Sequence, residues 1–137
     1  MGAGRKPALS VAIALLKSKQ PVRVVGTVPA TRPPVFVRVD LADANRSNLV
    51  TVKPMLIFEC WASNSVAAEE LANSIADVLE SCEAESVVYK DAAGVDRRAW
   101  INSAEIVSDP RPFDDPDPAI SQSRWQVVAE LGIATNQ

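Results

Sequence analysis

Residues 55–62, Met-Leu-Ile-Phe-Glu-Cys-Trp-Ala, form the densest apolar run in this chain of 137 residues. A β-strand places alternate residues on opposite faces of a sheet. One face of this run would carry Leu56, Phe58 and Cys60, and the other Ile57, Glu59 and Trp61. Because both faces are largely apolar, the run predicts a central strand that is covered on both sides.

Three candidate N-cap residues, Ser63-Asn64-Ser65, follow this run directly and predict the start of a helix. Beyond them, apolar residues recur every three or four positions, which is typical of an amphipathic helix from about 65 to 83. Glu69 and Glu70 lie near its start, where the helix dipole favours negative charge. The chain therefore contains a strand that leads through a polar cap into a helix.

The rest of the chain predicts one more helix and four more strands. The helix covers residues 8–16 and ends before Pro21, whereas residues 84–97 are interpreted as a loop or weak hairpin. The resulting order is α-β-β-β-α-β-β, in a single domain that spans residues 1–137. The fold class is α+β, with one mostly antiparallel or mixed sheet and two helices packed on it. The further strands are expected at 22–25, 35–39, 98–107 and 124–133.

Two long segments lack a regular period. Residues 41–53 are polar and predict a mobile loop that becomes ordered at an interface. Residues 108–119 predict a Pro/Asp-rich turn, because the four prolines between 109 and 118 remove donors and fix φ. The turn lacks the glycine and bidentate glutamate of a calcium loop, so we expect its carboxylates to be solvated. These carboxylates belong to Asp109, Asp114, Asp115 and Asp117.

The composition argues against catalysis and against a metal or cofactor site. The chain has no histidine, which removes the commonest general base and the commonest metal ligand. Cys60 and Cys82 form no C-x-x-C motif, so they predict two buried reduced thiols, with one disulfide as the alternative. An enzyme would have to use carboxylates such as Glu59, Asp109 and Asp115, which form no recognisable catalytic pattern. No run reaches the roughly 18 apolar residues of a membrane span.

The net charge of −3 hides a division along the chain. Residues 1–53 hold nine Lys or Arg and two Asp or Glu, a net charge of +7. Residues 54–137 hold five and fifteen, a net charge of −10. The positive charges are scattered, and the acidic remainder would repel phosphates, so direct DNA binding is disfavoured. Opposite charges on one small domain suit a subunit that meets different neighbours on its two sides.

The three tryptophans, Trp61, Trp100 and Trp125, all fall on predicted strands, where core packing is the default. Trp61 is the strongest candidate for a protein interface, because it shares a strand face with Glu59 and because tryptophan is enriched among interface anchors.

Four segments follow one another in a specific order: L-I-F-E-C-W-A-S-N (56–64), A-A-E-E-L-A-N-S-I-A-D-V-L (67–79), P-R-P-F-D-D-P-D-P (110–118) and S-R-W-Q-V-V-A-E-L (123–131). This order resembles the tail terminator (tail completion) proteins of bacteriophages with long non-contractile tails. In that family a central strand enters the main helix through a polar cap. A P-D-P turn later precedes an arginine–aromatic pair, here Arg124-Trp125, that opens the last strand. The resemblance covers about residues 8–134.

The resemblance implies a virion structural protein that forms a homo-oligomeric ring, usually of six copies, on the head-proximal end of the tail tube. Such a ring stops polymerisation of the major tail tube protein and provides a docking surface for head-completion or neck proteins. Genomic DNA passes through its lumen without specific binding. The implied location is the head–tail junction, after assembly in the host cytoplasm. A head-closure or other neck protein of the same particle is the alternative.

The charge division and this resemblance together suggest where the subunit meets its partners. We expect the basic third and the 41–53 segment to face a neighbouring subunit or the tail tube, and acidic residues of the C-terminal portion to line the channel. The residues expected at the subunit or tube interface are Arg32, Arg38, Asn45, Arg46, Asn48 and Trp61.

Overall fold

The apolar run lies in strand β3, which occupies the interior of a six-stranded sheet, as predicted. The computed structural model describes residues 6–46 and 51–135, with the main chain alone for residues 43–46. In chain order the elements are α1 (Ala8–Lys19), β1 (Val24–Val25), β2 (Phe36–Arg46), β3 (Thr51–Ala62), α2 (Ser65–Glu80), β4 (Glu85–Lys90), β5 (Asp96–Pro112) and β6 (Ser123–Ala134).

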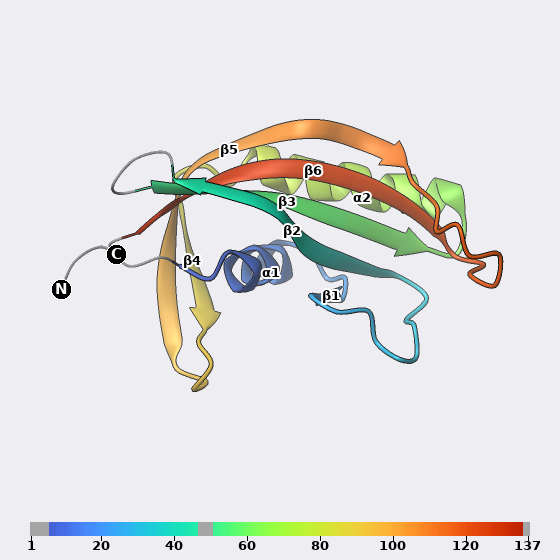
Figure 1. Ribbon diagram of the computed structural model, residues 1–137, viewed down its shortest axis with the longest axis horizontal. Coiled ribbons are helices and arrows are strands. Elements are labelled where there is room, and N and C mark those ends of the chain that lie inside the picture. The colour runs from blue at the N-terminus through green and yellow to red at the C-terminus, as the bar shows by residue number, and fades with distance from the viewer. Residues whose placement is uncertain (1–5, 47–50, 136–137) are drawn as a thin grey trace.

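The strands form one mixed sheet in the order β1-β2-β3-β6-β5-β4 (Figure 1). The short β1 pairs with β2 in parallel, and every other neighbouring pair is antiparallel. The α+β class with two helices and one sheet is therefore confirmed. Within the segment interpreted as a loop or weak hairpin, residues 85–90 form the additional strand β4.

Both helices pack on the same face of the sheet, and the hydrophobic core lies between them and the strands. Leu56, Phe58 and Cys60 of β3 face this core and are fully buried. The opposite face, which we call the open face, carries Ile57 and Glu59. The prediction that both faces of this strand are covered is therefore wrong along most of β3. No described helix lies over the open face, and side chains shield it most completely near Trp61.

The polar cap between β3 and α2 works as predicted. The side-chain oxygen of Asn64 accepts a hydrogen bond from the backbone N–H of Ala67 at 2.9 Å, so Asn64 is the N-cap. Ser65 accepts a hydrogen bond from the indole N–H of Trp125 at 3.1 Å. This contact ties the start of α2 to β6.

The predicted mobile loop at 41–53 is wrong for most of its length. Residues 41–46 continue β2 and residues 51–53 begin β3, with Asn45 opposite Lys53 and Arg46 opposite Val52. Pairing with a neighbouring strand satisfies the main-chain groups whatever the side chains are, and so overrides polar composition. A register shift between Leu41 and Asp43 also breaks the alternation that would reveal the strand. Residues 47–50 lie outside the described residues.

The predicted turn at 108–119 also begins later than expected, because β5 continues to Pro112. Pro110 falls in a register shift between Ser108 and Arg111, where a proline removes no ladder hydrogen bond. Beyond Ile101, β5 pairs with β6 alone among the described strands, so its outer edge tolerates prolines. Residues 113–122 form the irregular connection that was expected, and Asp115 and Asp117 accept backbone N–H groups within it.

The β4–β5 hairpin bends away from the sheet and projects beside α1 (Figure 1). Asp91 holds its turn by accepting backbone hydrogen bonds from Ala93 and Val95 and by pairing with Arg97 at 2.9 Å. The Val95 N–H and the Arg97 guanidinium lower the pKa of Asp91, because they stabilise its charged form. Gly94 closes the turn with a φ of +81°, a value that favours glycine.

Both cysteines are free and buried, as the sequence favours. Burial, followed by the charge of Glu85, raises the pKa of the Cys82 thiol to about 11. Burial raises the pKa of Cys60 well above its usual range, and Glu59 adds to this effect.

The described residues contain no helix with the length and apolar character needed to cross a bilayer.

Because the thiolate is the reactive form, both cysteines should resist a thiol reagent such as dithionitrobenzoate in the folded protein at pH 8. Both should react rapidly once denaturant unfolds the chain, which a colorimetric assay would measure. Rapid stoichiometric labelling of the folded protein would contradict this burial.

Candidate functional site

Glu59 is a charged residue in the interior of the sheet and is only 8% exposed. Its Oε2 lies 3.3 Å from Nη1 of Arg38 and 3.5 Å from Nη1 of Arg124. Its Oε1 accepts a hydrogen bond from the indole N–H of Trp61 at 3.4 Å. Arg38 is directly opposite Glu59 on β2, and Arg124 is opposite Trp61 on β6. One carboxylate therefore joins side chains from three neighbouring strands.

The ring of Trp61 is the centre of a stack on the same face. Phe36 stacks on it, with ring centroids 5.6 Å apart and planes 7° from parallel. The guanidinium carbons of Arg32 and Arg124 lie 4.7 Å and 5.0 Å from the Trp61 ring centroid. Each such cation–π contact contributes about 0.5–2 kcal/mol, depending on its desolvation. The indole is therefore held by one aromatic ring and two cations.

The stack continues beyond β6. Arg124 also lies 5.0 Å from the ring of Phe113, and Arg111 lies 5.4 Å from that same ring. The backbone N–H of Arg124 donates to Asp114 and its Nε donates to the carbonyl of Phe113, so its guanidinium is fixed between the two rings. We call this set the arginine–aromatic ladder. Its members are Phe36, Trp61, Arg124, Phe113 and Arg111, with Arg32 on Trp61.

The structure divides the predicted interface residues into two groups. Arg32, Arg38 and Trp61 meet at the ladder and around Glu59. The main chain of Asn45 and Arg46 lies at the other end of β2, which at about 3.3 Å per residue is roughly 30 Å away. Asn48 lies outside the described residues. The six residues therefore do not form one continuous site.

Trp61 itself is only 1% exposed in the single chain, because the ladder covers it. A partner would meet Arg32 before it met the indole, and a role for Trp61 in an interface stays a prediction. Trp100 is 37% exposed on the hairpin, so the expectation that it packs in the core is wrong. Trp125 packs against the core, as expected.

The remaining ladder residues carry only partial signals in the sequence. Arg124 stood out in an arginine–aromatic pair and Phe113 in the proline-rich turn, but nothing in either segment shows that they stack together. Glu59, considered as a possible enzymatic carboxylate, has both oxygens engaged by Arg38, Arg124 and Trp61. These contacts hold the guanidinium groups of Arg38 and Arg124 on the open face.

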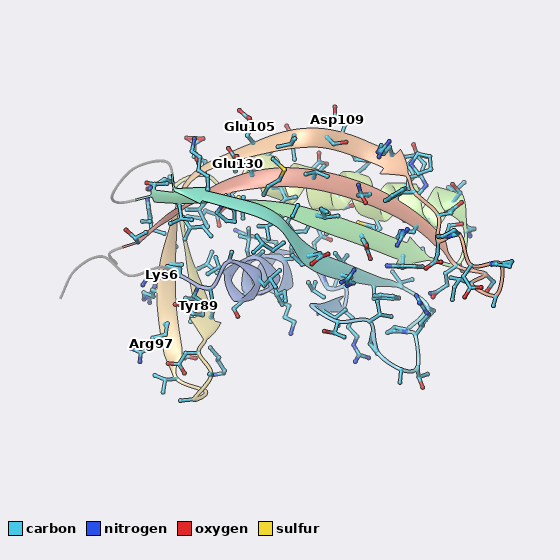
Figure 2. The ribbon with its side chains drawn as sticks, in the orientation of Figure 1. Lys6, Tyr89, Arg97, Glu105, Asp109 and Glu130 are labelled. Atoms are coloured by element: carbon cyan, nitrogen blue, oxygen red, sulfur yellow. The ribbon has the colours of Figure 1, made fainter. Side chains whose placement is uncertain are left out.

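The β5 side of the open face carries a second feature, an acidic strip formed by Glu105, Asp109 and Glu130 over β5 and β6 (Figure 2). Glu105 and Glu130 are directly opposite each other in the β5–β6 register. Like charges in opposite positions repel and destabilise a sheet. No ion pair offsets them within residues 6–46 and 51–135. This part of the open face therefore repels other anions.

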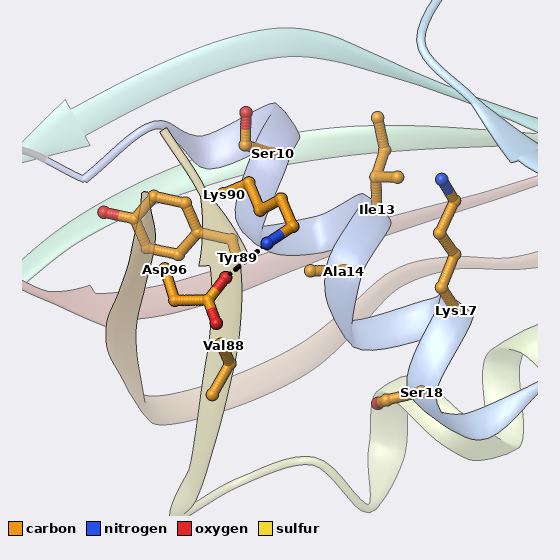
Figure 3. A pocket seen from close by; sticks show the side chains of 9 residues that line it. All are labelled: Ser10, Ile13, Ala14, Lys17, Ser18, Val88, Tyr89, Lys90 and Asp96. Atoms are coloured by element: carbon orange, nitrogen blue, oxygen red, sulfur yellow. Dashed lines mark hydrogen bonds and ion pairs between the residues drawn. The ribbon is translucent and has the colours of Figure 1, made fainter. Parts of the chain in front are cut away.

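A groove of about 710 Å³ lies between α1 and β4 (Figure 3). Ile13 and Ala14 of α1 and Val88 of β4 line it, and the ion pair between Lys90 and Asp96, 2.7 Å apart, borders it.

Across the described parts of the chain, no three His, Cys, Asp or Glu residues are grouped so that they could hold a metal ion.

Replacing Glu59 by Gln should lower the free energy of unfolding by about 3 kcal/mol, because two largely buried guanidinium groups would lose their carboxylate. Chemical denaturation would measure this change. The control Asp96→Asn removes the carboxylate of an exposed ion pair and should change stability far less. Equal effects of the two substitutions would contradict the organising role of Glu59.

No protein-family model and no curated protein matches the sequence. Among solved structures, the chain is similar to one from the virion of a native gene transfer agent particle. The TM-score is 0.61 and the sequence identity is 14%. The match covers 93% of this chain and 96% of the other. At this identity the likeness shows that the two chains share a fold along nearly their whole length.

Proposed function

We propose that this chain is a virion structural protein, and specifically a tail terminator that forms a ring at the head-proximal end of a phage-like tail tube. The observation that carries the proposal is the near-complete overlap of its fold with a chain of a gene transfer agent virion. The order of strand, polar cap, helix, P-D-P turn and arginine–aromatic pair adds support from the sequence. If the ring follows the resemblance to tail terminator proteins, it contains six copies of the chain.

The open face suits the wall of a channel through which DNA moves. Proteins hold DNA mainly by placing Lys and Arg against phosphates and releasing counterions. The acidic strip at Glu105, Asp109 and Glu130 offers no such contact (Figure 2). In the proposed ring, this strip faces the lumen and lets genomic DNA pass without being gripped.

Capping requires that the two ends of the ring differ. One end binds the last layer of the tail tube protein, and the other binds head-completion or neck proteins and offers no site for another tube layer. The chain has distinct surfaces for these roles. The ladder is at one end of the strands, and the β4–β5 hairpin, with Trp100 and Val88 exposed, projects near the other (Figure 1).

Addition of the purified chain to polymerising tail tube protein should shorten the tubes in proportion to its concentration, because each ring ends growth at one end. Negative-stain electron microscopy would measure tube length and locate the added density. The Asp96→Asn variant alters an exposed ion pair on the hairpin and tests whether the charge of the hairpin contributes to the shortening of the tubes.

Tubes of unchanged length would contradict the terminator. If the chain instead bound only isolated neck proteins, the result would favour the alternative, a head-closure or other neck protein of the same particle. That alternative rests on the same fold similarity, since the matched structure is a whole virion.

Replacing Glu105 and Glu130 together by Lys should convert the open face from repellent to attractive for DNA. The assembled variant should bind double-stranded DNA at 150 mM salt, and its affinity should fall steeply as salt rises. Fluorescence anisotropy of labelled DNA would measure both effects, with the wild-type ring as control. Equal binding by variant and wild type would contradict a lumenal position for the acidic strip.

A further inference from the structure

The β4–β5 hairpin ends the sheet with a free strand edge. β4 is the last strand in the sheet order, and it pairs with β5 alone among the described strands. The N–H of Asp91 donates to the carbonyl of Val95, so these two residues form a hydrogen-bonded pair. Because such pairs alternate along an antiparallel ladder, the main-chain groups of Ser86, Val88 and Lys90 point away from β5. This edge therefore offers donors and acceptors to a further strand.

The usual protections of an edge strand are weak in β4. Its residues, Glu85–Lys90, include no proline, and their register with β5 continues without a bulge. The one lysine in the strand, Lys90, is paired with Asp96 across the hairpin, so its charge is offset. The outer edge of β5 differs, because it contains Pro110 and Pro112. Of these two edges, β4 is the one that suits strand addition.

The groove between α1 and β4 lies beside this edge (Figure 3). Its residues on α1 recur at the spacing of one helix face, and they are Ser10, Ile13, Ala14 and Lys17. Ile13 and Ala14 are half-buried, and Val88 on β4 is 47% exposed. Because α1 packs against the buried face of the hairpin, a strand added to β4 places alternate side chains over this helix face. The groove thus provides an apolar floor for such a strand.

The charges around the groove are not balanced within the chain. Lys17 lines the groove, is exposed and forms no ion pair with another described residue. The carboxylates between residues 85 and 101 are each paired already: Glu85 with Lys19, Asp91 with Arg97, and Asp96 with Lys90. A carboxylate on an added strand would therefore be attracted by Lys17, and a cationic strand would be repelled.

We propose that the β4 edge and the adjoining groove bind an extended segment of another protein, which adds a strand to the sheet. The segment is about as long as β4 and presents an apolar side chain to Ile13 and Ala14 and a carboxylate to Lys17. Main-chain hydrogen bonds to β4 supply affinity, and the side chains in the groove supply selectivity. This inference goes beyond the proposed function and does not rest on it, since the site lies outside the open face.

A displayed library of random dodecapeptides, selected on the immobilised full chain, provides the probe. The selected peptides should alternate apolar residues with at least one Asp or Glu, and fluorescence anisotropy of a labelled peptide would measure affinity. Lys17→Glu should weaken binding at least tenfold, because it replaces the attracting cation by an anion. The matched control is Arg23→Glu, which reverses another exposed cation outside the groove and should leave binding unchanged.

Val88→Pro tests the addition of a strand. It removes the N–H of residue 88, which points away from β5, so the hairpin should be retained, as circular dichroism would verify. This variant should lose peptide binding, whereas Val88→Thr, which keeps the N–H, should bind as wild type does.

Equal binding by Val88→Pro and Val88→Thr, selection of cationic peptides, or failure to select any peptide would overturn this inference and leave the proposed function standing. Wild-type oligomers that dissociate on the Val88→Pro substitution, in sedimentation velocity, would also overturn it, because a second copy of this chain would then occupy the edge.

Discussion

The ion pairs of the Glu59 carboxylate are the interaction on which the open face of this protein depends. A carboxylate in the middle of a sheet is unfavourable unless it is paired, and Glu59 is paired twice, with Arg38 on β2 and Arg124 on β6. Its contact with the Trp61 N–H also orients the indole. Because Arg124 is held in this way, it can lie between Trp61 and Phe113 and extend the ladder to the end of β5.

The two faces of the sheet therefore lie in different environments. The helices cover one face and supply the hydrophobic core, while the ladder shields the aromatic residues of the other face at one end only. Over β5 and β6 the open face carries the acidic strip. In the proposed ring, the acidic part of this face lines the channel.

The sequence predicted the parts of the fold whose signals are local. The passage from β3 through Asn64 into α2 has an apolar run, a cap and a helical period in consecutive residues. Residues 41–46 were misread because their strand is polar and contains a register shift, so that only pairing with β3 reveals it. Pro110 was misread because tolerance of a proline depends on which strand edge is free, which is a property of the whole sheet.

The same limit applies to the candidate site. Arg32, Arg38 and Trp61 were recognised as residues of interest, but their meeting around Glu59 depends on strand register, which no local pattern encodes. Cryo-electron microscopy of the head–tail junction of a particle assembled with this chain tests the account most directly. We expect this fold in a single ring above the last tube layer, with the open face toward the lumen. A junction in which the chain is absent from that layer, or in which α2 faces the lumen, would contradict it.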